Sequence, residues 1–164
     1  INYLNQEITQ YLVLSNGLEL PQRDLRLVGG LFHVVNDIER MGDHAENLVE
    51  YAEYSMENKL TFSDVGIAEL TEMTDKVMKM LENTFNTLKE RDHRLAEEVL
   101  RQEEEIDNLR DELRKNHIER LNAQKCTAGS GVIFLDIVSN LERIADHATN
   151  VVQSVLDEGK SRNY

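Results

Sequence analysis

The chain has 164 residues, of which 31 are acidic and 18 basic, and a formal net charge of −13 at pH 7. This excess of negative charge argues strongly against a nucleic-acid backbone or an anionic membrane surface as the main partner. A single Cys and a single Pro, with no Trp, exclude a disulfide scaffold and favour long helices. No apolar run approaches the roughly 18 residues needed to span a bilayer, so we expect no transmembrane segment in this sequence.

Apolar residues recur at spacings of three and four almost throughout, which predicts an all-α fold. Gly17 predicts the end of a first helix, and Pro21 suits the first turn of the next. Ser63 or Asp64 predicts the N-cap of a third helix, and Asp92 that of a fourth. In chain order, the predicted helices cover residues 1–15, 21–58, 64–90, 93–122 and 127–159.

Two glycine-containing segments need a separate explanation. Gly29 and Gly30 lie inside the second predicted helix, where glycine is unfavourable and where it could allow a close approach of another helix. Residues 127–131 could cradle an anion at a helix start but lack the Lys-Ser/Thr of a phosphate loop. We therefore expect a turn and a close-packing segment there.

A polar pattern occurs twice in the chain. Residues 36–47 and 139–150 both contain Glu-Arg-x-x-Asp-His-x-x-Asn, at a constant offset (142 − 39 = 103). The polar residues recur identically, whereas apolar ones exchange, as in Ile38 and Leu141. A packing constraint tolerates such apolar exchanges, and a solvated surface would have let the polar residues drift. The repeat therefore indicates selection for its polar chemistry.

The repeat extends backward along the chain. Residues 1–4 match residues 106–109 at an offset of 105 (106 − 1), but residues 64–105 have no counterpart before the first copy. We predict two antiparallel three-helix bundles related by the internal repeat, over residues 1–60 and 61–164, with the first bundle lacking its opening helix. Because the chain begins within a helical pattern, we expect it to be part of a longer protein.

The repeated motif places pairs of carboxylates on single helix faces. At about 100° per residue, Glu39 lies one turn before Asp43, and Glu142 lies one turn before Asp146. Such a pair offers oxygen ligands that suit a hard cation. The sequence therefore predicts bound divalent or trivalent metal ions, and Fe, Zn, Mn and Mg are all compatible because oxygen-rich sites select weakly. Weaker candidates for ligands are Asn47, Asn150 and Asp107.

Other interpretations of these residues stay open. Arg40 stands between the two acids of the first pair, so an ordinary surface row of salt bridges is the alternative to a metal site. The acidic run of Glu103, Glu104, Glu105 and Asp107 has the pattern of a solvated face, from which Asp107 could turn toward the carboxylate pair. His44 and His147 lie about 80–100° from the carboxylates, which favours hydrogen bonding at the helix flank over metal ligation. The His-rich sets of metal phosphohydrolases and the Glu-x-x-His motif of di-iron bundles are missing, so we predict no enzyme.

Two copies of Glu-Arg-x-x-Asp-His-x-x-Asn, about 100 residues apart on long helices, closely resemble the PhoU family. The resemblance extends from Ile1 to about Val155. It implies two three-helix bundles and multinuclear metal clusters on the Glu/Asp-x-x-x-Asp motif, which here falls on the two acidic pairs. It also implies a non-catalytic regulator of inorganic phosphate uptake that acts on a membrane transporter and a sensor kinase.

Residues 40–53 are most similar to the PhoU-type domain fused after sodium/phosphate cotransporters. This implies the cytoplasmic C-terminal domain of such a cotransporter, at the inner face of the plasma membrane, with a membrane phosphate transporter as its partner in cis or in trans. A free-standing PhoU regulator and a metal-free helical adaptor or dimerisation domain are the alternatives. A missing helix leaves apolar surface uncovered on residues 1–58, which predicts a homodimer or an exchange of helices between chains.

Overall fold

The computed structural model describes the backbone of residues 1–160 and the side chains of residues 1–157. Within this range every regular element is helical, so the predicted all-α fold is confirmed. The helices begin and end within one or two residues of the predicted positions. They are α1 (Asn2–Asn16), α2 (Gln22–Glu57), α3 (Asp64–Glu90), α4 (His93–Asn122) and α5 (Ala128–Lys160).

Local sequence explains where the helices begin and end. The side chain of Ser63 accepts a hydrogen bond from the backbone N–H three residues later, at 3.1 Å, and caps α3. Asp92 caps α4 in the same way, accepting a bond of 2.8 Å from the N–H of Arg94. Each such cap is worth about 1 kcal/mol of helix stability. Gly17 ends α1 as predicted, although its φ of −80° is not left-handed.

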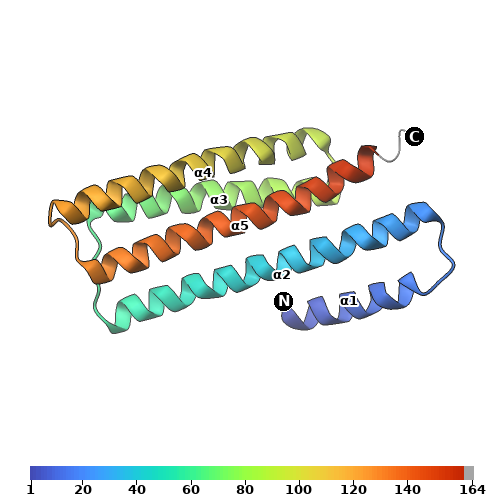
Figure 1. Cartoon of the computed structure of the whole chain (residues 1–164), viewed down its shortest axis with the longest axis horizontal. Coiled ribbons are helices and arrows are strands. Elements are labelled where there is room, and N and C mark those ends of the chain that lie inside the picture. Colours follow the sequence, from blue (N-terminus) through green and yellow to red (C-terminus); the bar gives the residue numbers. More distant parts are fainter. Residues whose placement is uncertain (161–164) are drawn as a thin grey trace.

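Successive helices run in opposite directions, and α5 lies between α2 and the α3–α4 pair (Figure 1). Helices α3, α4 and α5 each contact the other two and form a three-helix bundle. In the described part of the chain, α1 packs only on α2, and α2 in turn packs along α5 in the most extensive helix–helix contact. The predicted pair of bundles, with the first lacking a helix, agrees with this arrangement. The division of the chain at residue 60 stays a prediction.

The hydrophobic core lies mainly inside the α3–α4–α5 bundle. Burying each aliphatic side chain there stabilises the fold by about 1.5–3 kcal/mol. Helix α2 adds Val34 and Met41, whereas Leu12 is the buried apolar residue of α1. The fully buried side chains of the bundle include Met73, Val77, Met80, Val99, Ile106, Leu113, Val138, Val151 and Val152.

The glycines behave differently from one another. Helix α2 is continuous through Gly29 and Gly30. A Cβ at Gly29 would meet no atom within 4 Å, and one at Gly30 would meet Ser154 Oγ of α5 at 3.8 Å, an ordinary contact, so the approach of α5 does not require glycine at either position. By contrast, a Cβ at Gly131 would lie 2.6 Å from Nε2 of the buried His117. The predicted close packing at residues 127–131 is therefore confirmed. Of the helices that the structure describes, none is long and apolar enough to cross a membrane.

Candidate metal centre

The His and Asn residues of the first motif copy point across the interface between α2 and α5. Nδ1 of His44 lies 2.9 Å from Oδ1 of Asn140, and Asn47 donates a hydrogen bond of 3.0 Å to the same oxygen. Asn140 is buried and its own amide donates to a backbone carbonyl within α5, at 2.9 Å. One side chain of α5 therefore binds two motif residues of α2.

The second motif copy makes the matching set of contacts in the opposite direction. Nδ1 of His147 lies 2.8 Å from Oδ1 of Asp37, and Asn150 donates a hydrogen bond of 3.2 Å to the same oxygen. Asp37 and Asn140 occupy equivalent positions in the repeat (140 − 37 = 103). The two sets are therefore related by the internal repeat, with a carboxylate as acceptor in one and an amide in the other.

The predicted hydrogen-bonding role of the two histidines is confirmed, and their rings also stack, with centroids 5.6 Å apart. Their partners, Asp37 and Asn140, were not predicted from the sequence. A signal was present, because positions 37 and 140 are polar in both copies and lie on the same helices as the motif. Periodicity could not indicate which helix they face.

The acids of the second copy belong to a different cluster, between α4 and α5. Glu103, Asp107 and Asp146 each offer a carboxylate oxygen, and these oxygens lie within 4.8 Å of one another. Asp107 and Asp146 were predicted candidates, and the structure brings them together. Glu103 was assigned to a solvated run, but it is partly buried, whereas Glu104 and Glu105 are exposed. The sequence did contain a signal for this position. Glu103 lies one helical turn before Asp107, so the two side chains share a face of α4.

Arg110 lies beside this cluster and offsets part of its charge. Its guanidinium pairs with Glu142, donates to Asp107 at 2.8 Å, and donates to Asp111 at 3.0 Å. The hydrogen bond to Asp111, and after it the bond to Glu142, raises the pKa of Arg110 above its usual value, against the effect of burial. Glu142, a predicted ligand, is therefore held by an arginine next to the triad of acids.

The negative charge of the cluster is not fully balanced. Burial raises the pKa of Glu103, and the nearby carboxylates of Asp107 and Asp146 raise it further. Burial also raises the pKa of Asp146, with added effects from Glu142 and Asp107, while His147 and Arg110 act in the opposite direction. A bound cation would relieve this repulsion, and three carboxylates suit a hard metal ion. The residues present therefore fit a metal ion.

The acids of the first copy lack the acidic neighbours that the second copy has. Exposure does not distinguish the copies, since Glu39 and Glu142 are partly buried and Asp43 and Asp146 are exposed. The residue that matches Asp107 is Asn2, and the residue that would match Glu103 precedes Ile1 (103 − 105 = −2), outside this sequence. In the described part of the chain, the three-acid group that can hold a metal is the α4–α5 triad.

The candidate amides have other partners in the structure. Asn47 and Asn150 were weaker candidates for metal ligands, and both donate across the α2–α5 interface. Their side chains therefore contribute to the contact between the repeats. A role for either in metal binding stays a prediction.

Comparison with known proteins places these features in a family. Residues 1–52 and 70–155 match the family model described as the PhoU domain. The chain is 27% identical over 158 residues to the phosphate-specific transport system accessory protein PhoU homolog 1 of Thermotoga maritima, covering 95% of this chain and 67% of the relative. It is 29% identical over 133 residues to the PhoU homolog of Deinococcus radiodurans, covering 81% and 61%. The chain thus spans about two thirds of these relatives.

Solved structures agree on the fold. A crystal structure of PhoU from Pseudomonas aeruginosa superposes with a TM-score of 0.91 at 22% identity, covering 98% of this chain and 76% of that one. The phosphate transport system regulatory protein PhoU from Streptococcus pneumoniae gives a TM-score of 0.79 at 24% identity, covering 96% and 76%. At these identities the likeness concerns the fold alone.

Proposed function

The chain belongs to the PhoU family, and from that premise we propose that it is a PhoU-type accessory regulator of inorganic phosphate transport. The names of the relatives from Thermotoga maritima and Deinococcus radiodurans support this role. The observation that carries the proposal is the doubled motif, whose His and Asn residues join the repeats while Asp146 joins a cluster of acids.

The relatives favour the free-standing regulator over the cotransporter domain, because both are named as accessory proteins of a phosphate-specific transport system. In this proposal the chain acts in the cytoplasm at the inner face of the plasma membrane, on a membrane phosphate transporter in trans, and catalyses no reaction. The parent gene decides between the two forms. Long apolar helices encoded upstream would support the cotransporter, and a separate start codon would support the regulator.

The metal is part of the proposal. Asp146, Asp107 and Glu103 would hold a divalent or trivalent cation, and its charge would offset the burial and the repulsion that raise the pKa values of Glu103 and Asp146. The ion would supply local positive charge and would fix α4 against α5. Fe, Zn, Mn and Mg are all compatible with oxygen ligands. Elemental analysis of the purified chain tests this, and substoichiometric metal after loading with each of these ions would contradict it.

A homodimer remains part of the proposal. Leu4, Tyr11 and Leu14 on α1 are 60%, 71% and 67% exposed, which is unusual for such large apolar side chains. A second copy of the chain would cover them. Light scattering at tens of micromolar should give about twice the chain mass of 18.9 kDa, and a monomer at that concentration would contradict the dimer.

The regulatory role has its own experiment. Cells that lack the parent gene should lose control of phosphate uptake when phosphate is abundant, and the intact gene should restore it. The same gene carrying Asp146→Asn tests the metal part, whereas Glu97→Gln removes an exposed acid of α4 and is the control. Normal control of uptake without the gene would contradict the proposed function.

A further inference from the structure

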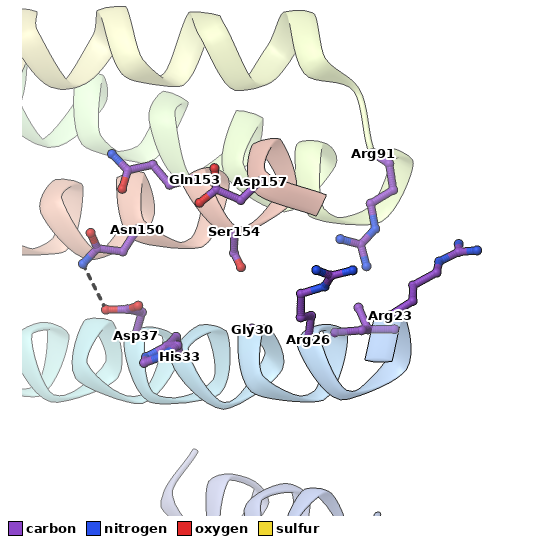
Figure 2. Close-up of a pocket in the computed structure, with 11 residues that line it drawn as sticks. Arg23, Arg26, Gly30, His33, Asp37, Arg91, Asn150, Gln153, Ser154 and Asp157 are labelled. Carbon is purple, nitrogen blue, oxygen red and sulfur yellow. Dashed lines mark hydrogen bonds between the residues drawn. The ribbon is translucent and has the colours of Figure 1, made fainter. Parts of the chain in front are cut away.

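A pocket with charged and polar side chains in its lining lies where α2, α5 and the turn between α3 and α4 meet (Figure 2). Its volume is about 620 Å³, within the range that holds organic ligands in other proteins. It includes none of the three acids of the candidate metal centre. It therefore needs its own explanation.

Three arginines line one end of the pocket. Arg23 and Arg26 come from the beginning of α2, and Arg91 comes from the α3–α4 turn. Figure 2 shows the side chains of Arg26 and Arg91 extending toward each other across the space between these elements. The chain as a whole carries a net charge of −13, whereas the lining of this pocket has three arginines against two aspartates, so the group of arginines is locally positive. Such a group suits an anion with more than one negative charge.

Helix stability does not explain these arginines. Acidic residues are favoured in the first turn of a helix, and the positive end of the α2 dipole opposes Arg23. Arg91 adopts a left-handed backbone with φ of 57°, as Lys59 and Gln124 do just after other helices, so this turn does not by itself require arginine. Neither the helix end nor the turn therefore accounts for the choice of arginine at these two positions.

The internal repeat supplies a comparison within the same molecule. The positions that match Arg23 and Arg26 are Cys126, just before α5, and Gly129 on α5 (23 + 103 and 26 + 103). The two repeats share the same helix–helix contact, so that contact does not require arginine at these places. Arginine at these two positions therefore occurs in the first repeat and not in the second.

The rest of the pocket offers neutral hydrogen-bonding groups and two acids. Gln153 and Ser154 on α5 donate and accept, and Asp37 and Asp157 supply carboxylate oxygens. A simple anion would be repelled by the acids and would leave most of the pocket unfilled. A ligand with a phosphate at one end and a hydroxyl-bearing body fits both ends, because hydroxyl groups can donate to carboxylates.

We propose that this pocket binds an organic phosphate, with the phosphate against Arg26 and Arg91 and a hydroxyl-bearing body against Gln153 and Ser154. The guanidinium groups form charge-assisted hydrogen bonds to phosphate oxygens. This ligand site is independent of the metal proposal. Binding is therefore measured in the presence of a chelator, where a metal at the acidic cluster cannot contribute.

Isothermal titration calorimetry of the chain with adenosine diphosphate, glucose 6-phosphate, adenosine and inorganic phosphate tests the proposal. At least one of the two organic phosphates should bind, and more tightly than inorganic phosphate or adenosine. Arg26→Gln should weaken binding at least about tenfold, because one charge-assisted contact is lost. Arg40→Gln removes an exposed arginine of the same helix and should leave binding unchanged.

A second pair of variants fills the pocket without altering its charge. A Cβ at Gly30 has room, with Ser154 Oγ 3.8 Å away, so the larger side chain of Gly30→Leu should enter the pocket and block binding. Gly29→Leu adds the same side chain at an exposed position and should bind normally. Absence of binding by both organic phosphates, tighter binding of inorganic phosphate, or equal binding by all variants would overturn the proposal.

Discussion

The imidazole rings of His44 and His147 stack with their centroids 5.6 Å apart and their planes 19° from parallel, although 103 residues separate them (147 − 44 = 103). Each ring belongs to one motif copy, and each bonds to the helix of the other copy. The motif therefore has two structural tasks. Its His and Asn residues join α2 to α5, and the Asp of its second copy faces the acids of α4.

Asp37→Ala should destabilise the fold. The change removes the acceptor shared by His147 and Asn150 and leaves two polar groups at the α2–α5 interface without this partner. Loss of a partner for such groups costs about 1–3 kcal/mol in the free energy of unfolding. Urea denaturation measures this. Asn36→Ala, at the exposed neighbouring position, should change stability by no more than about 0.5 kcal/mol, and equal effects would contradict the bridging role.

Gly131→Ala should destabilise the fold by about 1–3 kcal/mol through overpacking. The new Cβ would lie 2.6 Å from the ring of His117, which is buried and stacked on Phe134. Gly129→Ala is the matched control, since its Cβ would lie 3.8 Å from a methyl group of Leu60. That control should be neutral or slightly stabilising because alanine favours a helix over glycine. Melting temperatures of both variants test the prediction.

Glu103→Gln should weaken metal binding as much as loss of a predicted ligand does. Glu103 supplies one of the three clustered oxygens, although it lies in a run of acids. Calorimetric titration with Mn²⁺ and Zn²⁺ measures the effect. Glu97→Gln on the same helix removes an exposed acid and should leave the affinity unchanged. Equal metal affinities of the Glu103→Gln and Glu97→Gln variants would show that Glu103 is not a ligand.

Without metal, the acidic cluster should make stability fall as pH rises. The pKa values of Glu103 and Asp146 are raised in the folded chain, so the folded state holds protons that the unfolded state has lost. Their contribution is therefore present below the unfolded pKa values and is lost as pH rises through the folded ones. In chelator, Asp146→Asn should gain stability relative to the original chain as pH rises above the unfolded pKa values. A stability difference that does not change with pH would contradict the raised pKa values.

Helix limits could be predicted from sequence because the signals that end helices are local. Ser63 and Asp92 bond to backbone groups within three residues, so neighbouring sequence determines those caps. The partners of the motif residues depend on how helices rotate against one another. Periodicity indicated which residues share a face of α4, but packing against α5 decided that Glu103 turns toward Asp146 and that Glu104 stays exposed.

Asp37 was missed for the same reason. Its importance depends on the crossing of α2 and α5, which brings it within 2.8 Å of a histidine 110 residues away in the sequence. The pocket arginines were equally hidden, because Arg91 lies in a different element from Arg23 and Arg26. The site is formed by contacts between segments that are far apart in the sequence. A single sequence does not show which distant residues are in contact.

Thermal melting of the chain and of Asp146→Asn, each with and without metal, tests the proposed metal centre most directly. A ligand that binds only the folded state raises the melting temperature when it is present. The original chain should gain stability when Mn²⁺, Fe²⁺, Zn²⁺ or Mg²⁺ replaces the chelator, and the variant should gain much less. In chelator alone, the variant should be at least as stable as the original chain near neutral pH. Equal responses of the two proteins to every metal would contradict the metal centre.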